Sequence, residues 1–125
     1  MQLRRMLVVA GVLGVALLAP AGGASAAETE VTMRCPGTVT CVVQARLFPG
    51  GTIAIDVETI GPRPDLRGQW QLTDDASTRT FCKGQFTVGD PRRSWLCENV
   101  PAGPVTLFSS VASDDGAEHL IGLRY

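Results

Sequence analysis

The residue types of a catalytic triad occur near the only histidine, His119. The neighbouring candidates for nucleophile and acid are Ser109, Ser110, Ser113, Asp114 and Asp115. A serine hydrolase of the nucleophile-elbow type holds its serine on a tight turn flanked by glycines, and no such glycines accompany these serines. His119 also alternates in phase with Ile121 and Leu123. We therefore expect a structural histidine on a strand, and no enzyme.

Two pairs of adjacent carboxylates, Asp74–Asp75 and Asp114–Asp115, are the other candidates for chemistry. Either pair could act as an acid–base dyad, and residues 113–118, "SDDGAE", could offer oxygen ligands to calcium. That segment is too short for an EF-hand loop. Both pairs fall at expected turns, where aspartate accepts hydrogen bonds from nearby backbone amides. We expect capped turns and no cofactor.

The four cysteines predict two disulfides. The strand-like stretches 30–35 and 38–48 place Cys35 and Cys41 on the same face, on either side of a Pro-Gly turn. A local Cys35–Cys41 bridge leaves Cys82 to pair with Cys97, which closes a loop worth about 3 kcal/mol in the chain-entropy model. A zinc site is the alternative. It is disfavoured because the chain has no CxxC spacing and its histidine is distant in sequence.

The first 26 residues predict a secretory signal peptide. Arg4 and Arg5 precede an apolar run from residue 7 to residue 18, and Ala24-Ser25-Ala26 supplies small residues for cleavage. A membrane anchor is the alternative, but a span needs about 20 apolar residues. Residues 27–125 would then form one secreted domain, with no membrane contact after cleavage. One lysine against ten arginines is typical of GC-rich coding, as in an actinobacterium.

The net charge argues against nucleic acid and anionic membrane as partners. Of the 11 basic residues, Arg4 and Arg5 would leave with the signal peptide, so nine remain against 12 acidic residues, a net charge of −3. A chain with this balance has no electrostatic reason to bind nucleic acid or an anionic membrane.

Period-two alternation of apolar and polar residues runs through the rest of the chain. The expected strands lie within residues 30–35, 38–48, 51–60, 67–74, 78–88, 94–100, 103–113 and 118–125. Clusters of Gly, Pro and Asp separate them, at spacings near ten residues. These features predict an all-β fold: a single antiparallel β-sandwich, immunoglobulin-like or transthyretin-like, with seven to eight strands and two disulfides.

Two loops are candidates for binding a partner. In residues 61–68, "GPRPDLRG", Pro62 and Pro64 fix their own backbone torsions and push their preceding residues towards extended conformations. The segment would be held open before a partner arrives, which lowers the ordering cost of binding. The contacts expected here come from Arg63, Pro64, Leu66 and Arg67. The second loop, "VGDPRRSW", offers Arg92 and Arg93 between Cys82 and Cys97. The alternative is that both are solvated turns, the first an inert crossover between sheets.

The stretch "AETEVTMRC", residues 27–35, is a third candidate surface. Its contacts would come from Glu30, Val31 and Met33. The segment either forms an edge strand of its own sheet or pairs with a sheet edge of another protein.

The layout resembles two groups of secreted proteins. It is similar to the small adapter subunits of streptomycete umbrella toxin particles, in which a disulfide-bonded β-domain joins a stalk protein to a lectin-bearing subunit. The matching features are "AETEVTMRC" and "IGPRPDLRG". It also resembles actinobacterial chromoprotein carriers, although none of their cleft residues is matched. The stretch "NVPAGPVTLFSSV" is similar to a turn of transthyretin-like sandwiches.

We therefore expect a secreted, non-catalytic protein-binding module, in its most specific form an adapter linking subunits of an extracellular toxin complex. The alternative is an inhibitor of an extracellular trypsin-like protease. Its target bond would be Arg93–Ser94 and not Arg63–Pro64, because a proline after the arginine usually blocks cleavage. A small-ligand carrier is the third class.

Overall fold

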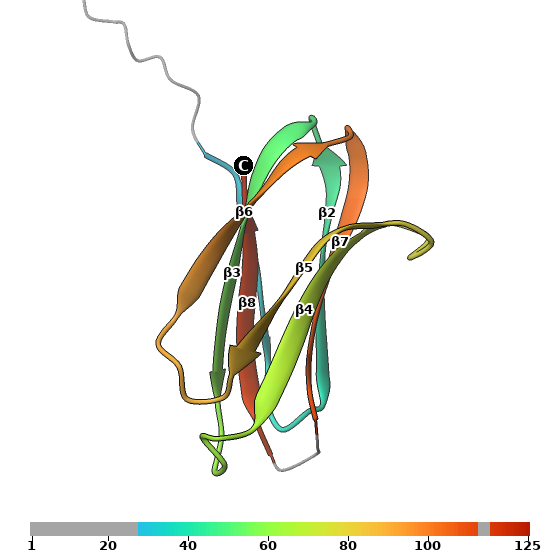
Figure 1. The fold of residues 1–125 in the computed structure, drawn as a ribbon. Helices are drawn as coiled ribbons and strands as arrows, with labels where there is room; N and C mark the ends of the chain where they lie inside the picture. The colour runs from blue at the N-terminus through green and yellow to red at the C-terminus, as the bar shows by residue number, and fades with distance from the viewer. Residues whose placement is uncertain (1–27, 113–115) are drawn as a thin grey trace, which may run out of the picture.

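Eight antiparallel strands form two four-stranded sheets in the computed structural model, which describes residues 28–112 and 116–125 (Figure 1). The strands are β1 (Glu30–Cys35), β2 (Thr40–Phe48), β3 (Gly51–Ile60), β4 (Arg67–Asp74), β5 (Thr80–Thr87), β6 (Arg93–Val100), β7 (Gly103–Val111) and β8 (Glu118–Arg124). Their bounds differ by at most two residues from those expected. The antiparallel sandwich is confirmed.

The chain pairs with itself as one long hairpin that has been rolled up. Its tip is the β4–β5 turn, and the two halves then pair outward as β3 with β6, β2 with β7 and β1 with β8. Rolling brings β8 beside β3 and β7 beside β4. The resulting sheet orders are β1-β8-β3-β6 and β2-β7-β4-β5.

This strand order is that of a jelly roll. Six of the seven connections pass from one sheet to the other, and only β4 and β5 are consecutive neighbours in one sheet. In an immunoglobulin-like sandwich several consecutive strands are sheet neighbours. The sandwich therefore does not have the immunoglobulin-like connectivity, which was one of the two expected. The sequence could not decide this point, because alternation identifies strands and their faces but not their partners.

Asp74 closes the turn at the tip of the hairpin. Its Oδ1 accepts hydrogen bonds from the amides of Thr78 and Arg79 at 2.8 and 3.2 Å, and the Thr78 hydroxyl donates to Oδ2 at 2.8 Å. Ser77 has φ 57°, in the left-handed region. The expectation that this aspartate caps a turn is confirmed.

The core lies between the two sheets. Ile53 and Ile55 of β3 are fully buried, as are Leu72 of β4 and Leu107 of β7. Burying one such side chain stabilises the fold by about 1.5–3 kcal/mol. Met33 has the inward phase that we expected, but it remains 42% exposed because β1 lies at the edge of its sheet.

The two disulfides join the sheets along both open sides. Cys35–Cys41 links β1 to β2, with Cα atoms 5.7 Å apart, and Cys82–Cys97 links β5 to β6, with Cα atoms 6.2 Å apart. These four strands are the edge strands of the two sheets. Both predicted pairings are confirmed, and together they clamp every edge strand to its counterpart in the other sheet.

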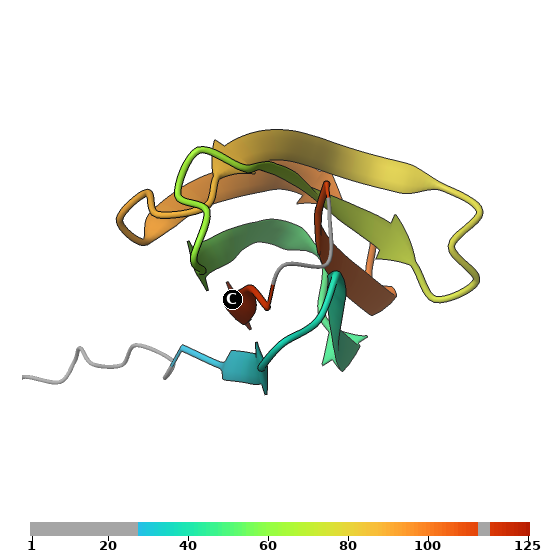
Figure 2. The same ribbon diagram turned by 90° about the horizontal axis from the view of Figure 1, so that it is seen from below.

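The connections gather at the two ends of the sandwich. One end carries the β1–β2, β3–β4 and β5–β6 connections (Figures 1 and 2). The other carries the β2–β3, β4–β5 and β6–β7 connections, together with Thr29 and Tyr125, whose amides and carbonyls pair at 2.7 and 2.9 Å. The expected signal peptide and the pair Asp114–Asp115 lie outside the described residues. Within the described ranges, no helix is long and apolar enough to cross a membrane.

Candidate functional site

The β3–β4 loop and the β5–β6 loop lie side by side at the same end of the molecule (Figure 2). The amide of Val88 donates to the carbonyl of Leu66 at 2.8 Å, and the amide of Gly89 donates to that of Thr59 at 2.9 Å. Gly89 also packs against Pro64. The two loops that the sequence nominated separately therefore form one composite surface, which we call the loop face (residues 61–65 and 89–92).

The β3–β4 loop is anchored at its C-terminal end. Leu66 is only 8% exposed and belongs to the core. Its side chain is therefore not available to a partner, contrary to the contact that we expected from it. Its amide donates to the carbonyl of Arg63 at 3.2 Å, which closes the loop. The intervening residues 62–65 are exposed. Because the anchor is buried and the tip carries Pro62 and Pro64, the tip is presented in one preferred conformation.

The arginines of the β3–β4 segment differ in setting. Arg63 is half-exposed, and its Nε lies 4.0 Å from a carboxylate oxygen of Asp65, at the limit of an ion pair. An exposed pair of this kind contributes about 0–1 kcal/mol to stability. Arg67 is exposed at the start of β4. Both guanidinium groups are open to solvent and able to contact a partner.

The arginines of the β5–β6 segment are structural as well as exposed. Arg92 donates from Nη2 to Oδ2 of Asp56 at 3.1 Å. The Arg93 guanidinium carbon lies 4.8 Å from the centre of the Trp95 ring, within the range of a cation–π contact. Its Nη1 lies 3.9 Å from Asp90. Substituting either arginine would thus alter the framework together with the surface.

The Arg93–Ser94 bond belongs to a strand. Both residues begin β6 and are paired with Val57 and Asp56 of β3. The Ser94 hydroxyl also hydrogen-bonds to Asp56. The bond therefore lies in a paired strand and not in an exposed loop. The inhibitor hypothesis assumed an exposed loop that a protease could bind.

Asp56 is the centre of an ionic cluster that sequence reasoning missed. Its alternation with Ile55 and Val57 directs it to the outer face of β3, where a charged side chain is expected to meet solvent, yet its side chain is only 3% exposed. Arg124 donates to its two oxygens at 2.7 and 3.0 Å, and Arg92 and Ser94 bond to it from the other side. Burial would raise the pKa of Asp56, but these hydrogen bonds outweigh it and hold the pKa at about 2.

The N-terminal segment pairs within its own chain. Strand β1 is an edge strand, hydrogen-bonded to β8, with Glu30 opposite Arg124, Val31 opposite Leu123 and Met33 opposite Ile121. Arg34 adds an ion pair with Glu118 at 2.8 Å. Of the two arrangements considered for this stretch, the structure therefore has the edge strand of its own sheet. Among the described strands, none pairs with the other side of β1.

His119 lies buried between the sheets and bonds to both neighbours. Its Nε2 donates to the carbonyl of Thr38 at 3.0 Å, since a carbonyl can only accept, and its Nδ1 accepts from the Ser109 hydroxyl at 3.0 Å. Burial lowers the pKa of His119, and the hydrogen bond with Thr38 opposes this shift less strongly. Both His119 and Ser109 are fully buried. The pair therefore joins the two sheets inside the core.

The remaining candidates for chemistry are a metal site and the other members of the triad. Within residues 28–112 and 116–125, no three His, Cys, Asp or Glu side chains converge so that they could hold a metal ion. The triad candidates Ser113, Asp114 and Asp115 lie outside that part.

Comparison with known proteins gives no family. No protein-family model matches the chain, and no curated protein matches it. Among solved structures, the chain is similar to a de novo designed double-stranded β-helix determined by solution NMR. The two share 17% sequence identity over 80% of this chain and 100% of the designed one, with a TM-score of 0.38. A likeness at that level carries no argument about fold or function.

Proposed function

We propose that the protein is a secreted, non-catalytic protein-binding module that acts as an adapter between subunits of an extracellular toxin complex. The observation that carries the proposal is the loop face. Two loops from distant parts of the sequence are hydrogen-bonded to each other and present exposed arginines and prolines at one end of the sandwich. A rigid surface of this kind is suited to docking, because little conformational entropy is lost on binding.

An adapter needs a second surface that stays accessible while the first is occupied. The N-terminal residues Glu28 and Thr29 lie at the end of the sandwich opposite the loop face, beside Tyr125. Within the described part of the chain, one side of edge strand β1 has no paired strand and could receive a further one. A partner on the loop face would not block either feature. The toxin-complex form of the proposal rests on the layout of an N-terminal strand, a disulfide-bonded β-domain and a protruding loop.

The test uses Arg63→Ala in the secreted protein. Tagged wild-type and variant proteins would capture partners from culture supernatant of the source organism, and the Kd for the captured partner would then be measured with purified proteins. Arginine at an interface hot spot contributes about 1–3 kcal/mol, so we expect the Kd to rise by roughly 5- to 150-fold. Leu66→Ala is unsuitable here, because Leu66 is buried and the variant would lose stability.

The matched control is Arg46→Ala. Arg46 is an exposed arginine on β2, near the end opposite the loop face, so the variant loses the same charge. We expect it to retain the wild-type Kd. If the wild type, Arg63→Ala and Arg46→Ala bind the partner with equal affinity, the loop face is not part of the interface and the proposal is wrong. If Arg63→Ala alone has a lower melting temperature, we would assign its loss of affinity to folding. The Kd of Pro64→Ala would then be compared with that of the wild type under conditions in which the two proteins are equally stable.

A further inference from the structure

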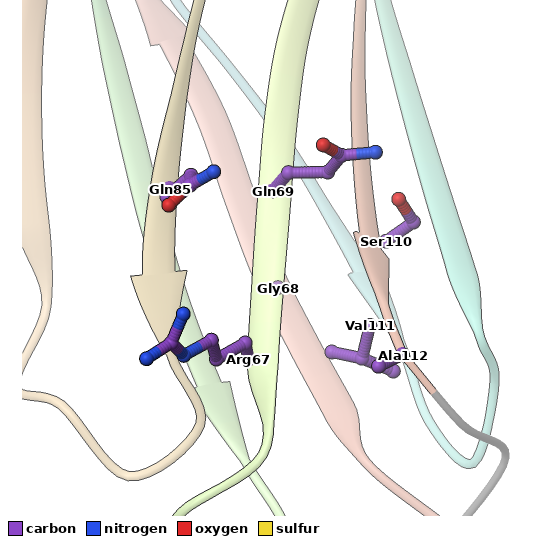
Figure 3. A pocket seen from close by; sticks show the side chains of 7 residues that line it. All are labelled: Arg67, Gly68, Gln69, Gln85, Ser110, Val111 and Ala112. Atoms are coloured by element: carbon purple, nitrogen blue, oxygen red, sulfur yellow. The ribbon is translucent and has the colours of Figure 1, made fainter.

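A shallow groove crosses the outer face of the β2-β7-β4-β5 sheet, beginning at Arg67 beside the β3–β4 loop and running along the sheet. It consists of two adjoining depressions of about 240 and 200 Å³ that share Gln69 and Ser110. The residues that line them and that the inference uses are Arg67, Gln69, Gln71, Gln85, Phe108 and Ser110. In Figure 3 the Gln69 side chain reaches from β4 towards Ser110 on β7, with Gln85 on β5 and Arg67 at one end.

Strand register sets these side chains in two rows across the sheet. One row runs from Gln85 through Gln69 to Ser110, each directly opposite the next. The neighbouring row places Gln71 between Phe108 of β7 and Lys83 of β5, and Lys83 does not line either depression. Adjacent strands lie about 4.8 Å apart, so the hydrogen-bonding groups of a row recur at about that interval. The groove therefore offers an ordered array of amides and a hydroxyl beside one aromatic ring.

Three side chains of this array have no hydrogen-bond partner among the described residues. Within residues 28–112 and 116–125, the side chains of Gln69, Gln85 and Ser110 make no hydrogen bond to another residue. Gln44, on the same sheet face, differs, because its amide donates to Asp75 and to Thr106 at 3.3 Å each. The groove residues are thus free to bond to a ligand.

The charge of the lining restricts the ligand. Arg67 is the single charged residue among the described residues that line the two depressions, and it lies at one end. A polyanion needs several cations along its path to be held against salt. An apolar chain would remove the amides from water without giving them partners, which is unfavourable. A neutral ligand rich in hydroxyl groups meets neither difficulty.

We propose that this groove binds a neutral oligosaccharide. Each glutamine amide presents a donor and an acceptor together, and two adjacent sugar hydroxyls can satisfy both at once. Phe108 is half-buried and offers the edge of an apolar surface to the C–H groups of a sugar ring. The groove is open along its length, so it accommodates a segment of a chain as well as a chain end.

The test is a titration of the folded, disulfide-bonded protein followed by two-dimensional NMR of its amide groups. The probes are soluble neutral oligomers of glucose, xylose, mannose and N-acetylglucosamine, each at about 10 mM, a level that detects a Kd near 1 mM. We expect at least one neutral oligomer to shift the signals of residues 67–71, 85 and 108–112. An oligogalacturonate of similar length serves as the anionic comparison.

Three variants locate the site. Gln69→Ala and Gln85→Ala should each raise the Kd about 2- to 10-fold, the effect of one net hydrogen bond. Gln44→Ala should leave the Kd unchanged, although it removes an amide from the same sheet face. No shift with any neutral oligomer, or binding of the anionic oligomer alone, would overturn the proposal. So would equal Kd values in all three variants. These results are independent of the loop face, because Arg63→Ala should bind the oligosaccharide like the wild type.

Discussion

Gly89 lies directly against Pro64: a Cβ atom built on Gly89 would stand 2.8 Å from the Cβ of Pro64. The two residues come from the β5–β6 and β3–β4 connections, so this contact is where the two halves of the loop face meet. Gly89 also has φ 96°, a backbone conformation that side-chain-bearing residues rarely adopt. Glycine is thus required here for two reasons, space and backbone torsion.

Gly89→Ala should separate the two loops. We expect the free energy of unfolding to fall by about 1–3 kcal/mol, from backbone strain and the clash with Pro64. Partner capture through the loop face should fall with it. Gly51→Ala is the control, since Gly51 has φ 111° but nothing within 4 Å of an added Cβ. It should lose stability by strain alone and keep its affinity. Urea unfolding and the Kd for the partner measure the two effects, and equal losses of affinity would argue against the contact.

Asp56→Asn should reduce stability at neutral pH and remove an acid transition. The pKa of Asp56 falls from 3.8 to about 2 on folding, so the folded protein releases its proton more readily than the unfolded chain. The stabilisation is present above pH 4 and is lost as the pH falls towards 2, and it is worth about 2 kcal/mol. Urea unfolding between pH 7 and pH 2 should show this loss in the wild type but not in the variant. Glu98→Gln, at an exposed residue of β6, should keep the wild-type profile.

His119 should make the protein less stable in mild acid. Its pKa is lowered in the fold, so below about pH 6.5 the unfolded chain takes up a proton that the folded state does not. Stability should therefore decline as the pH falls through this range. In His119→Gln, this decline of stability with falling pH should be absent. The variant should also be less stable at pH 7.5, because the hydrogen bonds of the imidazole with Ser109 and Thr38 are lost. Partner capture by the folded variant should be unchanged. A variant that melts normally but captures nothing would contradict a purely structural role.

Removing the Cys82–Cys97 disulfide should cost more stability than removing Cys35–Cys41. The two bridges span 15 and 6 residues of sequence, and the larger loop restricts the unfolded chain more. Replacing Cys82 and Cys97 by serine should lower the free energy of unfolding by about 2–5 kcal/mol, the usual cost of removing a native disulfide from a small domain. The matched Cys35/Cys41 double variant should lose less. Urea unfolding of the two variants tests the order, and non-reducing peptide mapping checks that the remaining bridge keeps its partner.

Strand positions and side-chain faces follow from the sequence alone, because period-two alternation is a local property of the chain. It located all eight strands and predicted both disulfides. It also placed His119 on the buried face of its strand. Turn chemistry was equally local, since Asp74 bonds to residues four and five positions ahead of it.

The partners of each strand were decided by tertiary structure. Alternation does not say which strand lies next to which, so the jelly-roll order could not be deduced from it. Asp56 is buried on an outward face only because Arg92 and Arg124 reach it from 36 and 68 residues away. The β3–β4 and β5–β6 loops meet because β3 pairs with β6 and β4 with β5 across the long hairpin, over separations that alternation cannot reveal. Leu66, which follows the first of these loops, enters the core. Such contacts cannot be predicted from local alternation, because they form only when segments distant in sequence are brought together by folding.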